Sequence, residues 1–346
     1  MKLGKTNLSV STQGLGCMSM SEFYGKPMTE SAGVALIKKA YQEGINFFDT
    51  ADMYACGKNE ALLGRAVSEL LGNDPSIRSE LVIATKCGVI RDENDPMKRG
   101  FDNSREYVLE CCDKSLKHLG SAVGFIDLYY IHRFSNQGAQ IDEAMKAMSE
   151  LLLQGKIKSV GLSEAKVNII QEANQALLKY TNGVHQLAAV QSEYSLMTRN
   201  VEKNGVLDIC RELGITFVAY SPLSRALLTD QINLLGKFEA EDFRQYLPRF
   251  SLKNLEHNKK IVEKIRKLAD IKHCTVSQIA LAWVMHQAGV VPLPGTTKEK
   301  NLLLNIEAEK LKLTKEDLDY LDTLETPLGY RYTEEAMRAY GFEDEL

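Results

Sequence analysis

The sequence predicts an α/β protein in which parallel strands close into a (β/α)8 barrel, also called a TIM barrel. Short apolar runs recur along the chain, and amphipathic stretches lie between them. A repeat of roughly 30–40 residues is typical of strand–helix units. No GxGxxG sequence follows an apolar run, which argues against the rival interpretation, an open doubly wound sheet of the Rossmann type.

The segment 1–11 alternates around a central turn, and this pattern predicts an N-terminal β-hairpin that plugs the barrel floor. Residues 227–258 are long for a loop, and such loops are often functional. The tail from Thr326 is rich in Tyr and Glu, and we expect it to pack over the barrel mouth. Because no linker interrupts the chain, residues 1–346 are predicted to form a single barrel domain with long loops at its C-terminal face.

Eight apolar runs are the candidate strands. They begin at Gly14, Ile45, Leu81, Ile126, Ser159, Leu187, Ile215 and Val290. The runs are continuous rather than alternating, which is typical of strands buried on both faces of a parallel sheet. Eight such strands with helices between them are the number that a closed barrel requires.

Amphipathic stretches between the runs are the candidate helices. They cover residues 33–42, 107–118, 141–153, 167–178 and 201–213. Each places its apolar residues near one face, as a helix that packs against a sheet does. Glycines follow several of them and are typical helix stops. These glycines are Gly44, Gly120, Gly155 and Gly214.

The composition excludes several classes of protein. Lys and Arg number 42 and Asp and Glu 46, so the net charge of −4 gives no support to nucleic-acid binding. No apolar run approaches the ~20 residues of a membrane span, and no secretion signal is recognised. The seven cysteines are odd in number and form no CxxC, which indicates reduced thiols and a cytoplasmic location. Histidines lack HxH or HxxxH spacing, so no metal site is predicted.

Reactive side chains end three successive candidate strands. Asp49, Lys86 and His132 follow the runs that begin at residues 45, 81 and 126, and Tyr54 lies five residues after Asp49. Each alone has an ordinary structural explanation, such as a turn or a helix cap. Because barrels build their active sites at the C-terminal ends of the strands, we expect the four side chains to meet.

The chemistry of this set is coherent. A tyrosine titrates near pH 10, and we expect the ammonium of Lys86 to lower the pKa of Tyr54. The Asp49 carboxylate would keep the lysine charged, and His132 would orient a carbonyl oxygen. The tyrosine could then act as a general acid. With no nucleophile or metal in the set, it suits hydride addition to a carbonyl, and the hydride must come from a cofactor.

At these residues the sequence resembles the aldo-keto reductase family over nearly the whole chain. The strings that carry the resemblance are FDTADMY, IATKCG, YYIHR, VGLSEA, VQSEYS, AYSPLSR and PLPGTTKEKNLLLN. VGLSEA, DFRQYLPRF and PGTTK are most similar to the branch that includes perakine reductase and the auxin-induced-type plant reductases.

The resemblance implies a (β/α)8 barrel that uses NADPH, with NADH as the alternative cofactor, to reduce a small-molecule aldehyde or ketone. It implies a catalytic tetrad of Asp49, Tyr54, Lys86 and His132, with Tyr54 as proton donor. Ser163 and Gln191 match residues that bind the nicotinamide carboxamide, and Tyr220 matches the residue that stacks on the ring. The pyrophosphate loop matches Ser221, Pro222, Leu223 and Arg225. The adenosine end matches Gly295, Thr296, Thr297, Lys298, Asn301 and Asn305.

The chain departs from the family at three positions where glycine is common. These are Ala55, Ser224 and Ala226, and a Cβ there limits positive φ angles. A second interpretation of the whole sequence also stays open. A regulatory subunit on the same fold would bind the cofactor but turn over little substrate, as the potassium-channel β subunits illustrate.

Overall fold

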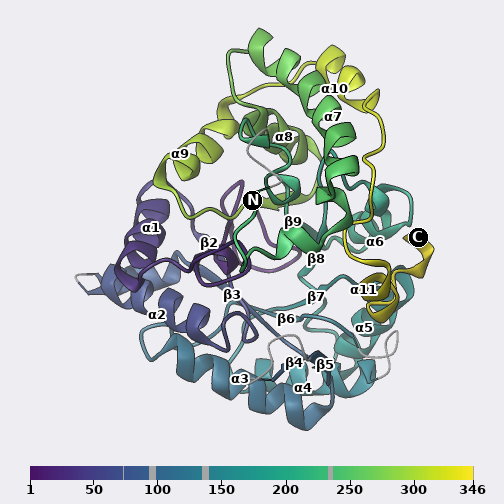
Figure 1. The fold of residues 1–346 in the computed structure, drawn as a ribbon. Helices are drawn as coiled ribbons and strands as arrows, with labels where there is room; N and C mark the ends of the chain where they lie inside the picture. The colour runs from purple at the N-terminus through teal and green to yellow at the C-terminus, as the bar shows by residue number, and fades with distance from the viewer. Residues whose placement is uncertain (73, 93–98, 135–139, 233–236, 346) are drawn as a thin grey trace.

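The computed structural model describes residues 1–72, 74–92, 99–134, 140–232 and 237–345. Eight parallel strands form a nearly closed barrel, and helices cover its outer side (Figure 1). In barrel order the strands are β1 (Leu15–Gly16), β2 (Phe47–Asp49), β3 (Val82–Cys87), β6 (Leu128–Ile131), β7 (Val160–Ser163), β8 (Ala189–Glu193), β9 (Thr216–Tyr220) and β10 (Val290–Leu293). The predicted fold class is therefore confirmed, and each apolar run coincides with one strand.

The barrel closes between its first and last strands. The Gly14 N–H donates to the Pro292 carbonyl over 3.0 Å, and the Gly16 N–H donates to the Pro294 carbonyl over 3.1 Å. A Cβ at Gly14 would lie 2.7 Å from side-chain atoms of Leu293 and Phe47. Only glycine therefore lets the chain approach this closely.

The helices lie outside the barrel. They are α1 (Glu30–Gln42), α2 (Lys58–Leu71), α3 (Arg105–Leu119), α4 (Ile141–Leu153), α5 (Val167–Tyr180), α6 (Val206–Leu213), α7 (Leu252–Ile271), α8 (Val276–His286), α9 (Glu299–Glu307), α10 (Lys315–Asp322) and α11 (Glu334–Ala339). No described helix is both long enough and apolar enough to cross a membrane. A small antiparallel strand pair, β4 (Val89–Arg91) with β5 (Arg99–Phe101), lies outside the barrel sheet.

Local chemistry explains where many helices begin and end. Thr29 and Ser104 accept hydrogen bonds from backbone amides at the starts of α1 and α3, as N-caps do. Thr275 and Gln278 form a capping box at the start of α8. The four predicted glycine stops follow α1, α3, α4 and α6, each with a positive φ.

Two sequence predictions about boundaries were wrong. The stretch 201–213 is not one helix, because a 3-10 turn (Asn200–Glu202) precedes α6, which starts only at Val206. The predicted long loop 227–258 ends early, because α7 begins at Leu252, where the Ser251 hydroxyl caps it. Of this loop, residues 233–236 lie outside the described part of the chain.

The N-terminal segment forms the predicted floor of the barrel. An antiparallel bridge joins Lys2 to Ser9, and Leu3 and Val10 are buried against the strand residues inside the barrel. The Gly4 N–H donates to the Thr216 hydroxyl at the start of β9 over 2.7 Å. With the floor plugged, the strand ends at the opposite face are the place for a site.

Candidate active site

Three neighbouring strands bring the predicted reactive side chains together. Asp49 ends β2, Lys86 lies at the end of β3, and His132 directly follows β6. The His132 N–H donates to the Cys87 carbonyl over 2.7 Å, which fixes this residue beside β3. Tyr54 lies in the turn after β2, where its N–H donates to the Ala51 carbonyl.

Lys86 is the centre of the cluster and is completely buried. Its Nζ donates to the Asp49 carboxylate, to the Thr50 carbonyl over 2.8 Å and to the Tyr54 hydroxyl over 3.4 Å. Asp49 also accepts a hydrogen bond of 2.9 Å from Gln191 Nε2. Burial lowers the pKa of Lys86, but Asp49 and Tyr54 outweigh it, so the pKa is raised and the ammonium stays charged.

Tyr54 lies between the lysine and the histidine. Its ring centroid is 5.0 Å from Lys86 Nζ and 5.8 Å from the His132 ring, which meets it edge-on. Burial raises the pKa of Tyr54, and Lys86 offsets this only in part. Lys86 lowers the pKa of Tyr54 as expected, but desolvation outweighs the ammonium, so the net shift of the pKa is upward. The phenol consequently holds its proton at neutral pH.

His132 is held neutral by its surroundings. Burial lowers its pKa well below the usual range, and the cations Lys86, Arg133 and Arg99 lower it further. Its buried Nδ1 has no hydrogen-bond partner among the described residues. A neutral imidazole can donate a hydrogen bond to a carbonyl oxygen, but it is a poor source of protons.

Apolar side chains surround the tyrosine. Met53 and Val89 pack with it, and the partly buried Met18, Phe23 and Phe101 join the same cluster. Burial raises the pKa of the neighbouring Cys17 thiol to about 12, so this cysteine is not a thiolate nucleophile. The wall of the site therefore suits a hydrophobic group beside a reducible carbonyl.

The next strands carry the residues predicted to bind a nicotinamide. Ser163 on β7 is directly opposite Gln191 on β8, and both are buried. Tyr220 ends β9 and is partly exposed. A carboxamide needs a donor and an acceptor, which a hydroxyl beside an amide side chain supplies. This donor set fits the expected cofactor.

The loop after β9 has a strained backbone. Ser224, Arg225 and Ala226 have φ angles of 46°, 57° and 76°, a region that favours glycine. The Arg225 guanidinium is buried and donates to the Glu193 carboxylate over 2.9 Å and to the Arg331 carbonyl over 3.2 Å. Arg225, which was matched to the pyrophosphate loop, thus has two protein partners.

The start of α9 provides a place for an anion. Lys298 is the residue before the helix, and no side chain caps the first amides. The Thr296 hydroxyl accepts from the Lys298 N–H over 3.1 Å and shapes the turn. Uncapped amides at a helix N-terminus favour phosphate, and the lysine adds a cation. Asn301 and Asn305 follow in the helix. These residues fit the adenosine phosphate end of the cofactor.

Comparison with known proteins assigns the chain. The sequence profile of the Aldo/keto reductase family matches residues 14–326. The chain belongs to the aldo/keto reductase family. As a member of this family the protein is an oxidoreductase with carbonyl-reducing activity.

Relatives cover nearly all of this aldo/keto reductase. "Probable aldo-keto reductase 1" from Glycine max is 40% identical over 319 residues, which are 92% of this chain and 86% of the relative. The structure of a glycerol dehydrogenase from Gluconobacter oxydans is similar with a TM-score of 0.79 and 27% identity, and 93% of each chain is covered. The holo form of an aldo-keto reductase from Bacillus halodurans has a TM-score of 0.72 and 25% identity, over 95% of this chain and 97% of that one.

The sequence reasoning missed two arginines at the candidate site of this aldo/keto reductase, Arg133 and Arg331. Arg133 donates to the Ser163 hydroxyl over 2.9 Å and to the His132 carbonyl over 2.8 Å. The HR pair in YYIHR was the available signal for it. Arg331 gave no comparable signal, because it reaches the site only through tertiary packing.

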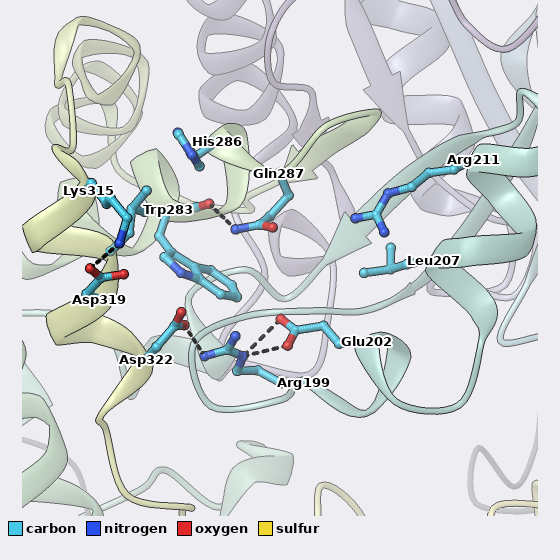
Figure 2. A pocket seen from close by; sticks show the side chains of 11 residues that line it. Arg199, Glu202, Leu207, Arg211, Trp283, His286, Gln287, Lys315, Asp319 and Asp322 are labelled. Atoms are coloured by element: carbon cyan, nitrogen blue, oxygen red, sulfur yellow. Dashed lines mark hydrogen bonds and ion pairs between the residues drawn. The ribbon is translucent and has the colours of Figure 1, made fainter.

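A separate hollow of about 390 Å³ lies among the outer helices α6, α8 and α10 (Figure 2). Arg199 lies on the Trp283 ring at 4.9 Å and pairs with Glu202 and Asp322. None of the predicted site residues lines this hollow, so it is distinct from the active site of the reductase.

Proposed function

We propose that the protein is an NADPH-dependent reductase that converts aldehydes and ketones to alcohols. The observation that carries the proposal is the contact of 3.4 Å between the Lys86 ammonium and the Tyr54 hydroxyl, with the neutral His132 beside them. NADH is the alternative cofactor.

When bound, the reduced nicotinamide supplies the hydride. Tyr54 keeps its proton at neutral pH and gives it to the carbonyl oxygen as negative charge develops there. Lys86 then stabilises the phenolate, and Asp49 holds the lysine charged and in place. His132 donates a hydrogen bond that orients the same oxygen. The apolar wall of Met53, Val89 and their neighbours excludes water from the reacting centre.

The cofactor assignment rests on three groups of residues. Ser163 and Gln191 would hold the carboxamide, and Tyr220 would stack on the ring. The loop Ser221, Pro222, Leu223 and Arg225 would lie along the pyrophosphate. Gly295, Thr296, Thr297, Lys298, Asn301 and Asn305 would hold the adenosine end. Lys298 provides the cation that a 2′-phosphate requires, which favours NADPH.

Three finer assignments accompany this function. We also propose that the chain lies in the branch of perakine reductase and the auxin-induced-type reductases, which its strings VGLSEA, DFRQYLPRF and PGTTK resemble. The seven free cysteines support a cytoplasmic location. The substrate is a small carbonyl compound with a hydrophobic group, because the wall beside Tyr54 is apolar.

The test is turnover of 4-nitrobenzaldehyde with NADPH, followed by NADPH absorbance. We expect wild-type activity, and we expect Tyr54→Phe to remove most of it while NADPH binding is retained. A Tyr54→Phe variant with near wild-type turnover would refute the role of the tyrosine. Tight NADPH binding without turnover across a broad aldehyde panel would instead identify a regulatory, cofactor-binding subunit.

A further inference from the structure

The C-terminal segment 327–345 lies beyond the part of the chain that the family profile matches, which ends at residue 326. In the structure this segment nevertheless reaches the barrel mouth, because Arg331 pairs with Glu164 after β7 and Tyr332 hydrogen-bonds Tyr220 at the end of β9. In Figure 1, α11 is drawn beside α5 and α6. Met337 and Phe342 of the segment are buried, so the segment is packed against the barrel.

Arg331 anchors the segment to the strand ends. Its guanidinium is 6% exposed and forms ion pairs with Glu164 at 2.8 Å and with Glu345 at 2.9 Å. Glu164 directly follows Ser163, and its other oxygen accepts from the Glu193 N–H over 2.9 Å. Although burial opposes it, Arg331 holds the pKa of Glu164 at about 2, so the pair stays ionised.

Tyr332 reaches the residue predicted to stack on the nicotinamide. A hydrogen bond of 3.0 Å joins its hydroxyl to that of Tyr220. The Arg225 guanidinium lies 4.5 Å from the centre of the Tyr332 ring. Tyr340 packs against Tyr332 with 5.6 Å between ring centres.

A third contact leads to the carboxamide position. The Arg133 guanidinium lies 5.8 Å from the Tyr340 ring and donates to the Ser163 hydroxyl. The segment therefore contacts Tyr220 and Arg225 directly, and it reaches Ser163 through Arg133. Tyr220 and Ser163 are predicted to surround the nicotinamide, and Arg225 is predicted to lie along the pyrophosphate. Lys298 and its neighbours are instead predicted to hold the adenosine end.

We propose that segment 327–345 positions the nicotinamide side of the cofactor site, with Arg331 and Tyr332 as its positioning residues. The Tyr332 hydroxyl fixes the Tyr220 ring, and Arg331 fixes the turn after β7. Preorganised side chains lower the entropy cost of binding, so the segment contributes to cofactor affinity without being part of the reaction. The proposal rests on the proposed function, because it requires that a nicotinamide cofactor binds.

The test compares two ligands that share the adenosine end. NADPH contains the nicotinamide, and 2′,5′-ADP lacks it. Dissociation constants are measured by calorimetry for wild type, for Tyr332→Phe and for the matched control Tyr320→Phe. Tyr320 donates one hydrogen bond of 2.9 Å to the Lys264 carbonyl on the outer helices. Tyr320→Phe therefore removes a similar hydrogen bond at a place outside the site.

We expect Tyr332→Phe to weaken NADPH binding about three- to tenfold, the effect of one lost hydrogen bond, and to leave 2′,5′-ADP binding unchanged. Arg331→Lys keeps the positive charge but loses the planar guanidinium that binds two carboxylates at once. We expect it, too, to weaken NADPH binding and to leave 2′,5′-ADP binding unchanged. Tyr320→Phe should change neither constant.

Equal weakening of both ligands by Tyr332→Phe would overturn the proposal, because it would indicate a general structural effect. Unchanged NADPH binding would overturn it as well. A wild-type protein that binds neither ligand would refute the proposed function itself and the inference with it. A different result would refute the inference alone. In that case the wild type binds NADPH and reduces aldehydes, and Tyr332→Phe binds NADPH as tightly as the wild type does.

Discussion

The buried ion pair of Lys86 and Asp49 permits a quantitative test by a double-mutant cycle. Lys86→Met leaves the Asp49 carboxylate buried, with Gln191 as its described side-chain donor. Breaking one side of a buried pair costs about 3–5 kcal/mol of unfolding free energy. Asp49→Asn leaves the ammonium buried and should cost a similar amount. The double variant removes both charges, so its cost should be smaller than the sum by about 2–3 kcal/mol.

The cycle has two readouts, stability and activity, and we expect the double variant to affect them differently. Denaturant unfolding at pH 7 gives the free energies, and NADPH-linked aldehyde reduction gives the activity. Stability should recover in part in the double variant, but activity should not, because Tyr54 has lost the ammonium that stabilises its phenolate. If the loss of unfolding free energy in the double variant equals the sum of the two single losses, Lys86 and Asp49 do not stabilise each other, and the reasoning is refuted. The exposed pair of Lys315 and Asp319, at 81% and 62% side-chain exposure, is the control and should show much weaker coupling.

The pH dependence of Lys86→Met provides an internal check. Burial already raises the pKa of Asp49 above its ordinary value, and Lys86 opposes this rise. Without the lysine, the folded-state pKa of Asp49 should rise further above the unfolded value, because the buried carboxylate can avoid its charge only by binding a proton. The folded state then binds more protons than the unfolded state, so stability falls as pH rises through that interval. The variant should therefore be closest to wild type at acidic pH.

Three other predictions concern the cofactor, the proton donor and a buried glutamate. Lys298→Ala should weaken NADPH binding about tenfold and NADH binding little, because only NADPH has a 2′-phosphate; calorimetry checks this, and equal effects would contradict the assignment. Turnover at saturating substrates should be flat from pH 7 to 9, since burial raises the pKa of Tyr54 and lowers that of His132; a step in that interval would show that one of them titrates there. His118 binds the buried Glu60 over 2.9 Å, and this bond raises its pKa above 6.5. Its stabilisation is present below pH 6.5 and is lost as pH rises through the raised value, so His118→Gln should lower the unfolding temperature more at pH 6 than at pH 9; a pH-independent difference would count against the pair.

Much of the fold, and the meeting of Asp49, Tyr54, Lys86 and His132 at one end of the barrel, could be predicted because the signal is local. Asp49, Lys86 and His132 each end an apolar run, and parallel strands bring such ends to one face of a barrel. The helix ends at Gly44, Gly120, Gly155 and Gly214 could also be predicted, because a glycine after a helix is a local signal. The direction of the Tyr54 pKa could not be predicted, because it depends on how completely the folded protein excludes water from the phenol.

Contacts between distant parts of the chain were also hidden. Arg225 and Glu193 are 32 residues apart, and Arg331 lies 106 residues beyond Arg225. The departures from glycine were informative, because Ala55, Ser224 and Ala226 all adopt positive φ angles. The sequence indicated the backbone strain at these positions, which costs about 1–2 kcal/mol for a residue with a Cβ.

The closure between β1 and β10 leaves the barrel with a seam. Pro292 and Pro294 have no N–H to return, so the described bonds across the seam run only from Gly14 and Gly16. A proline within a ladder marks an edge, and partial unzipping of the sheet should begin at such an edge. Gly295, at the predicted adenosine end, packs against Gly16. A dinucleotide bound there would stabilise the closed seam, so hydrogen exchange of the backbone amides at the seam should slow when the dinucleotide binds.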